Sequence, residues 1–216
     1  MLPTQPTRRR PEAALRAVQP RAQATRDALL SAGRALLSSR DYDALSIAEL
    51  AGAIGLSVGS FYGRFRDKAS FFALLQEQVA SEWLQAARQV LPAPDDADRS
   101  AKRILDDVVR TTIGVYRRNG GFIRAALKHA STHPGSWTPV QRTGALFVGE
   151  MAEALGPRLG HIPTAQRGPR IRFAMQMLFG TAVNAVLNDP GPLRLADRKL
   201  ERELTRAVCA YLEIAR

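Results

Sequence analysis

Residues 46–68 hold the side chains with the clearest capacity for chemistry, and that chemistry is the binding of anions. Ser46 and Glu49 stand three positions apart, which is the spacing of a capping box, so a helix is expected to start between them. Gly55 ends this helix early, and Ser57 offers a second N-cap. The spacing therefore predicts a helix-turn-helix, two short helices joined by a glycine-containing turn.

The second short helix has the composition of a segment that reads DNA. Its first turn consists of Val58, Gly59 and Ser60, whose small side chains let the helix N-terminus approach base edges or phosphates. Donors for phosphate oxygens follow in Tyr62, Arg64 and Lys68. The alternative is a helical corner in which Ser57 and Ser60 only cap the helix and contact solvent. Helical periodicity alone favours neither of these two interpretations.

Helices this short are unstable in isolation, so neighbouring elements must hold them. Apolar residues at helical spacing supply the contacts: Ile47, Leu50, Ala51, Ile54, Leu56, Phe61 and Phe65. Asp67 is expected to cap a long helix that starts at Lys68. The pattern thus predicts a small apolar hub behind the exposed helix tip.

Residues 29–75 resemble the DNA-binding domain of TetR/AcrR-family transcriptional regulators. The matching positions are Ser46, Ile47, Ala48, Leu50, Ala51, Gly55, Leu56, Ser57, Gly59, Ser60, Phe61, Tyr62, Phe65 and Lys68. Tyr42 matches the aromatic residue that ends the first loop of the family. The rest of the chain carries no sequence motif, and only its number of helices fits the family.

The resemblance implies two sets of DNA contacts. Phosphate contacts would come from Ser46, Tyr62 and Lys68. Residues in the major groove would be Ser57, Val58, Gly59 and Ser60. It also implies a homodimer that binds a palindromic operator in double-stranded DNA, since one short helix contacts few bases.

Three positions depart from the family pattern. Arg64 stands where His or Tyr is usual and would add a phosphate or guanine contact. Asp67 replaces Ser or Asn and brings a negative charge near the DNA backbone. Ala69 stands where Glu is usual. The charge of Asp67 is expected to lower the local affinity for DNA.

Charge favours a polyanionic partner. The 216-residue chain has 31 basic and 20 acidic residues, a net charge of +11 and a pI near 10.9. Arg8–Arg10 lie in a Pro- and Arg-rich segment, residues 1–19, that predicts a flexible arm. The arm would reach an adjacent minor groove or, as the favoured alternative, add only nonspecific attraction.

Composition and motifs exclude several other classes of protein. The 45% hydrophobic content predicts a soluble globular fold, and the single cysteine, Cys209, suits the reducing cytoplasm. The longest apolar run has 16 residues, too short for a membrane span of about 20. His129 and His133 have metal-ligand spacing, but no third ligand accompanies them. We therefore predict no membrane partner, metal, cofactor or catalytic residue.

Helical periodicity recurs along the chain, and no long segment alternates apolar and polar residues. The prediction is an all-α protein with a three-helix DNA-binding head and a helical-bundle domain, about nine helices in total. Besides the two short helices, the expected ranges are 20–39, 68–91, 98–118, 121–132, 139–156, 165–188 and 196–215. The domains would be an arm (1–19), a head (20–67), a connecting helix (68–91) and a ligand-binding and dimerisation domain (92–216).

Two features predict the role of the C-terminal part. Residues 173–187 are apolar on every face and must be covered all round, and with the amphipathic last helix they would form a two-fold four-helix interface. A monomeric core is the alternative. A ligand pocket would be lined by Tyr116, Phe122, His129, Trp137, Phe147, Met151, Met177 and Phe179. For each of these residues, plain packing is the competing interpretation.

The combined prediction is a transcriptional regulator, a repressor that an unidentified small-molecule effector releases from its operator. The alternative on the same fold is an architectural DNA-binding protein with a filled core and no effector. A cavity of several hundred Å³ would favour the regulator. An all-α enzyme is a third hypothesis, and it would need a titratable pair in a cleft.

Overall fold

The structure, a computed structural model, describes residues 12–93, 96 and 98–214. These residues form α-helices, two 3₁₀ helices and turns, without a strand, so the all-α prediction is confirmed. The α-helices are α1 (Glu12–Leu36), α2 (Ile47–Gly52), α3 (Val58–Tyr62), α4 (Lys68–Arg88), α5 (Ala101–Thr132), α6 (Thr138–Leu155), α7 (Thr164–Asn188) and α8 (Arg198–Tyr211). The 3₁₀ helices are η1 (Pro134–Trp137) and η2 (Gly156–Arg158).

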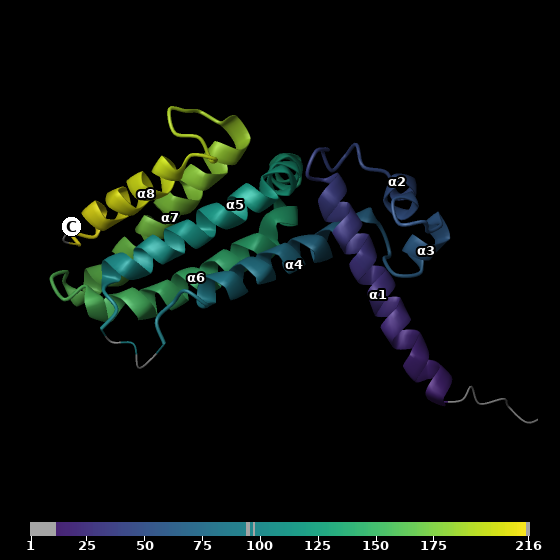
Figure 1. Cartoon of the computed structure of the whole chain (residues 1–216), viewed down its shortest axis with the longest axis horizontal. Helices are drawn as coiled ribbons and strands as arrows, with labels where there is room; N and C mark the ends of the chain where they lie inside the picture. The colour runs from purple at the N-terminus through teal and green to yellow at the C-terminus, as the bar shows by residue number, and fades with distance from the viewer. Residues whose placement is uncertain (1–11, 94–95, 97, 215–216) are drawn as a thin grey trace, which may run out of the picture.

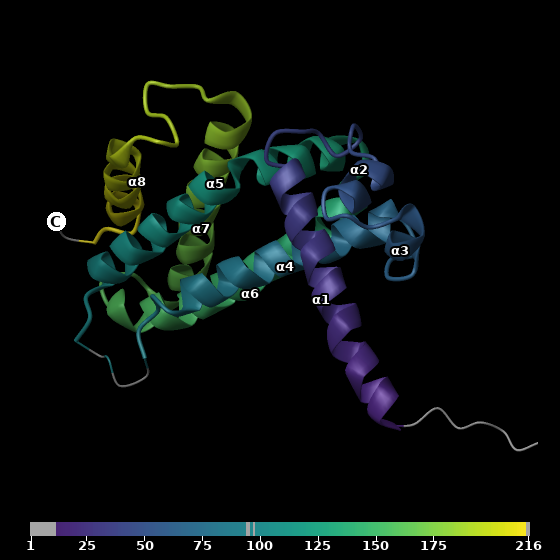
Figure 2. The same ribbon diagram turned by 45° about the vertical axis from the view of Figure 1, so that its right-hand side comes forward.

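The molecule divides into a head, made by α1 to α3, and a body, made by α4 to α8 (Figure 1). The helix α4 leaves the head and runs along the body, so it belongs to the packing of both parts. Figures 1 and 2 show α1 crossing the head and projecting away from the body at its N-terminal end. The predicted order, a helix-turn-helix head followed by a helical domain, is confirmed.

Local hydrogen bonds explain why the short helices of the head begin where they do. The Glu49 backbone N–H donates to Ser46 Oγ at 3.1 Å, and the Ser46 N–H donates to Glu49 Oε2 at 3.0 Å, which completes the capping box of α2. The Ser60 N–H donates to Ser57 Oγ at 3.2 Å and caps α3. Gly55, with φ +68°, makes the turn between them.

An aromatic cluster holds these two helices in place. Phe61, Phe65 and Phe71 have ring centroids 5.1–5.7 Å apart, and Phe61 and Phe71 are fully buried. The helix α1 packs tightly on this cluster, since a Cβ at Gly33 would lie 2.4 Å from Phe71 Cζ. Burial of these rings supplies the stability that helices of five and six residues lack.

The prediction of separate helices at 98–118 and 121–132 is wrong, because α5 continues through Asn119-Gly120-Gly121. Asn119 is buried, and its side-chain amide donates to the Val115 carbonyl at 2.9 Å, so it faces the protein as part of the helix. Gly121 packs against the end of α1, where its missing Cβ would lie 1.8 Å from the Ser38 carbonyl oxygen. The described residues therefore form eight α-helices instead of nine.

The first helix also begins earlier than predicted. It starts at Glu12 instead of Pro20, because residues 12–18 are mostly strong helix formers. Of the predicted arm, residues 1–11, which include Arg8–Arg10, lie outside the described residues. None of the described helices combines the length and apolar character needed to cross a membrane.

Candidate nucleic-acid interface and cavity

The outer face of α3 is exposed and carries small or amphipathic side chains. Val58 is 42% exposed and Tyr62 54% exposed, whereas Phe61 between them is fully buried in the aromatic cluster. The helix thus has one face fixed by packing and one face free to contact another molecule. Among the predicted DNA-contact residues, Ser57, Gly59 and Arg64 are also exposed.

Hydrogen bonds order the polar side chains of α3. The hydroxyl oxygens of Ser57 and Ser60 lie 3.1 Å apart, and Arg64 Nη1 donates to the Ser60 carbonyl at 2.9 Å. The guanidinium of Arg64 therefore lies along the end of α3, where it compensates an unpaired helix carbonyl. These contacts bring the predicted residues from Ser57 to Arg64 onto one small surface.

The ammonium of Lys68 packs against the head in this structure. Its Nζ lies 4.3 Å from the centroid of the Tyr42 ring and donates to the Asp43 carbonyl at 3.4 Å. Burial lowers the pKa of Lys68. The hydroxyl of Ser46 donates to Glu49 Oε2 at 2.9 Å, so two of the predicted phosphate contacts, Ser46 and Lys68, have partners within the head in this structure.

Sequence reasoning missed Arg66, whose side chain is 88% exposed. Its Nε donates to Asp67 Oδ2 at 2.8 Å, and this contact offsets the negative charge that the sequence placed near the DNA backbone. The Ser70 backbone N–H and Arg66 hold the pKa of Asp67 at about 2. The signal that could have revealed Arg66 is its position between Arg64 and Lys68.

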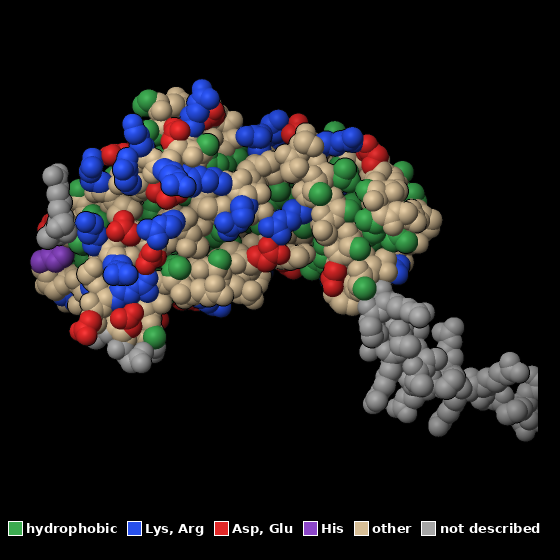
Figure 3. Space-filling view, viewed as in Figure 1, with side chains coloured by type: hydrophobic (Ala, Val, Ile, Leu, Met, Phe, Trp, Pro, Cys, Tyr) green, Lys and Arg blue, Asp and Glu red, His purple; other side chains and the backbone are tan. Residues whose placement is uncertain are grey.

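The basic charge is unevenly spread. Residues 22–68 hold six basic and five acidic residues, whereas residues 1–21 hold five arginines and one glutamate. In the view of Figure 3, Lys and Arg side chains gather over the body, and the head shows mostly apolar and uncharged atoms. The described part of the head is therefore nearly neutral in charge, and the basic excess of the N-terminal half of the chain lies within residues 1–21 of the sequence.

A cavity of about 740 Å³ opens in the body between α4, α5, η1, α6 and α7. Its lining is mainly apolar and aromatic, and its volume falls in the range of small-molecule sites. Four predicted residues line it: Tyr116, Phe122, Trp137 and Phe179. Sequence reasoning missed Trp83, Arg172 and Gln176. The α7 residues could have been found from their helical spacing, 172, 176, 179 and 183.

The other four predicted pocket residues lie elsewhere. Phe147 and Met151 are fully buried in the body core, and Met177 packs against the same core. His129 lies at the junction of head and body, where its ring is 4.1 Å from Tyr42 and 4.4 Å from His133 between centroids. Phe147 lies behind the cavity wall, since its ring is 5.0 Å from that of Trp83 between centroids. Sequence periodicity does not distinguish the lining from the layer behind it.

The junction at His129 predicts a dependence of stability on pH. The imidazole faces Asp43 across 3.6 Å, but burial, and next the charge of His133, lower the pKa of His129 below its ordinary value of 6.5. The folded protein therefore favours neutral His129, and its stability is expected to fall as the pH drops below about 6.5. Urea unfolding at pH 7.5 and 5.5 would measure this. His129→Gln should reduce the pH dependence, and the same dependence in parent and variant would contradict this role of His129.

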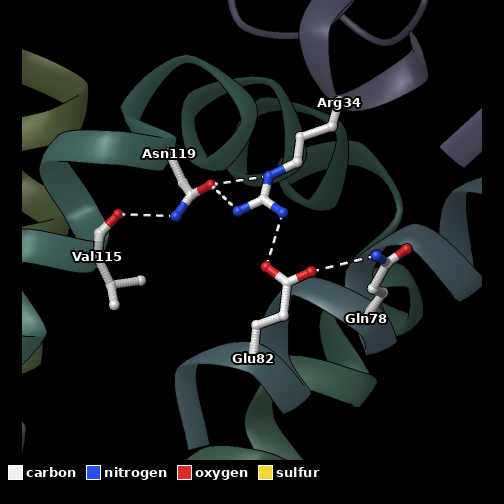
Figure 4. Close-up of polar contacts among 5 residues, drawn as sticks. All are labelled: Arg34, Gln78, Glu82, Val115 and Asn119. Atoms are coloured by element: carbon white, nitrogen blue, oxygen red, sulfur yellow. Dashed lines mark hydrogen bonds and ion pairs between the residues drawn. The ribbon is translucent and has the colours of Figure 1, made fainter. Parts of the chain in front are cut away.

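A polar bridge ties the head to α4 and α5, two of the helices that flank the cavity (Figure 4). Arg34 on α1 donates from Nε and Nη2 to Asn119 Oδ1 of α5, at 3.0 and 2.6 Å. Its Nη1 contacts Glu82 Oε2 of α4 at 2.6 Å, and Gln78 donates to the other oxygen of Glu82 at 3.1 Å. Asn119 also donates to the carbonyl of the cavity residue Val115 at 2.9 Å, and Glu82 precedes the cavity residue Trp83, so the bridge is connected to two residues of the cavity wall.

The faces of α7 and α8 that point outward carry uncovered apolar side chains. Phe173 is 47% exposed, Leu187 39% and Tyr211 37%. The rings of Phe173 and Tyr211 meet at 5.3 Å between centroids and join the two helices into one surface. Such a surface is typical of contacts between subunits.

Two family models match the chain. Residues 29–75 match the model described as bacterial regulatory proteins, tetR family, and residues 102–212 match the model described as tetracyclin repressor-like, C-terminal domain. The first match covers the helix-turn-helix and the start of α4, and the second covers most of the body. No curated protein matches the chain.

Several solved structures share the fold at low sequence identity. A tetR-family transcriptional regulator from Streptomyces coelicolor is 20% identical over 89% of this chain and 82% of its own, with a TM-score of 0.69. A relative from Mesorhizobium loti is 20% identical over 90% and 98%, with a TM-score of 0.69. PfmR from Thermus thermophilus is 18% identical over 87% and 99%, with a TM-score of 0.62.

Proposed function

This chain belongs to the TetR family of bacterial regulatory proteins, and from that premise we propose that it is a homodimeric repressor released from its operator by a small molecule. Membership makes it a DNA-binding transcriptional regulator. The observation that carries the proposal is the pairing of an exposed, small-residue α3 tip with a cavity in the body, in one chain whose helix α4 packs against both α1 and α6.

In the proposed complex, α3 enters the major groove of duplex DNA. Ser57, Val58, Gly59 and Ser60 lie nearest the base edges. Phosphate contacts come from Ser46, Tyr62, Arg64 and Lys68, with Arg66 added by the geometry described above. The nearly equal charges within residues 22–68 leave a large part of the nonspecific attraction to residues 1–21.

Selection from random duplex oligonucleotides tests the proposal, and Lys68→Ala tests its phosphate contacts. Losing one phosphate contact should weaken binding to all sequences and reduce the slope of log K against log salt by about one. Lys68→Arg should keep the slope, and Lys102→Ala on the body is the matched control. If no sequence is enriched, or if Lys68→Ala and Lys102→Ala give the same slope, the proposed interface is wrong.

We propose that two copies pair through α7 and α8. The exposed Phe173, Leu187 and Tyr211 would be covered in such a dimer, which members of the family usually form. Two heads then present two α3 helices to the halves of a palindromic operator, which explains how so short a helix gains specificity. Sedimentation of the free protein measures this pairing.

The cavity supports release by an effector. A volume of about 740 Å³ favours a ligand-binding regulator over an architectural protein with a filled core. The Arg34 bridge supports coupling, since it joins α1 to the α4 and α5 walls that a ligand would contact. Coupling of about 1–3 kcal/mol would weaken operator binding by roughly 5–150-fold. Such a regulator would act in the cytoplasm, where bacterial DNA lies.

A further inference from the structure

The cavity contains hydrogen-bond donors that the protein itself leaves unused. Trp83 lines the cavity, and its Nε1, beneath the cavity surface, has no acceptor within the described part of the chain. Tyr116 also lines the cavity, and burial raises its pKa to about 12, which keeps its hydroxyl protonated as a donor. Two amides, those of Gln141 and Gln176, complete the polar part of the wall.

Arg172 is the only Lys, Arg, Asp or Glu among the described residues that line the cavity. Its side chain is exposed, and no hydrogen bond or ion pair joins it to another described residue. Nearby arginines of the body are paired, Arg170 with Glu213 and Arg88 with Glu150. The cavity therefore combines an apolar interior with one positive charge that has no counterion among the residues described.

We propose that the effector is a monoanion with an apolar body, such as a carboxylate on an aliphatic or aromatic frame, with its charged oxygens at Arg172. The lining offers donors at Tyr116 and Arg172 but no carboxylate, so an acceptor-rich anion complements it and a cation does not. The apolar wall buries the rest of the molecule. This inference rests on the proposed function, because it names the ligand class of the same cavity.

The two tryptophans of the chain, Trp83 and Trp137, both line the cavity, so their fluorescence reports binding without DNA. Three probes of equal chain length separate the head-group chemistries: decanoate, decan-1-ol and decyltrimethylammonium, each titrated below its micelle-forming concentration into the full chain. Decanoate is expected to bind about 10–100-fold more tightly than decan-1-ol, because a charge-assisted hydrogen bond is lost in the alcohol. The cation should bind most weakly.

Arg172→Gln should abolish the preference for decanoate over decan-1-ol, and Arg172→Lys should restore most of it. Arg142→Gln is the matched control, because Arg142 is exposed on α6 beside Gln141 but outside the lining. The proposal is overturned if no probe binds, if the alcohol or the cation binds as tightly as decanoate, or if Arg142→Gln has the same effect. It is also overturned if Arg172→Gln loosens the dimer and leaves the preference intact.

The same titration separates this proposal from the regulatory one. If decanoate binds through Arg172 but does not release the protein from its operator, the proposed anion site is supported and the proposed release by an effector is contradicted. If the cationic probe binds and releases the DNA, the proposed regulatory function is supported and the proposed anion site is contradicted.

Discussion

Replacing Gly121 with alanine is expected to lower the free energy of unfolding by about 2–3 kcal/mol, one of the largest effects of a single methyl group in this chain. The added Cβ would lie 1.8 Å from the Ser38 carbonyl oxygen and 2.4 Å from its carbon, so backbone must move against backbone. Neither group can turn aside as a side chain can. Thermal unfolding should shift down by roughly 5–10 °C.

The neighbouring glycine provides the control. A Cβ at Gly120 meets nothing within 4 Å, and both residues lie in α5. Gly120→Ala should therefore stabilise the protein by up to about 1 kcal/mol, since alanine favours the helix. Opposite signs for these adjacent substitutions would establish the contact between α5 and the end of α1. Equal effects would show that helix propensity, and not that contact, sets the stability.

Replacing Gly59 with leucine is expected to weaken DNA binding at least about 100-fold while the protein stays folded. A Cβ at Gly59 meets only Ser57 Oγ, at 3.8 Å, so the free protein has room for the side chain. In the proposed complex that side chain stands between α3 and the base edges, and it holds the helix N-terminus away from the groove. Fluorescence anisotropy with the selected operator measures the loss.

Gly149→Leu is the matched control, because Gly149 lies on α6, is exposed like Gly59 and has nothing within 4 Å of its Cβ position. It should leave DNA affinity unchanged. Urea unfolding of both variants should give midpoints at or above that of the parent. If the Gly59→Leu protein binds the operator as tightly as the parent, α3 does not enter the major groove as proposed.

Local chemistry predicted the head well. Ser46, Ser57 and Asp67 each cap a helix at the position that the sequence indicated, because capping needs only one side chain and the backbone next to it. The class of fold and the order of the parts were predictable for the same reason. Hydrophobic periodicity and turn residues are local signals.

Features that depend on distant packing were not predictable. The pair Gly120-Gly121 signals a turn in isolation, yet it continues α5 because Gly121 meets Ser38, which is far away in the sequence. The residues that line the cavity were hard to predict for the same reason, because their selection depends on tertiary packing. Trp137 and Phe147 are both aromatic residues of the body, but only Trp137 lines the cavity, because tertiary contacts set the direction in which each side chain points.

The Arg34 bridge limits how hybrid sensors can be assembled from this chain. Exchanging heads among relatives would place a foreign first helix against Glu82 and Asn119, whose oxygens accept from the Arg34 guanidinium here. A graft cut at the start of α4 separates the donor from both acceptors. A working transplant must carry an arginine at the equivalent site, or replace all three residues together.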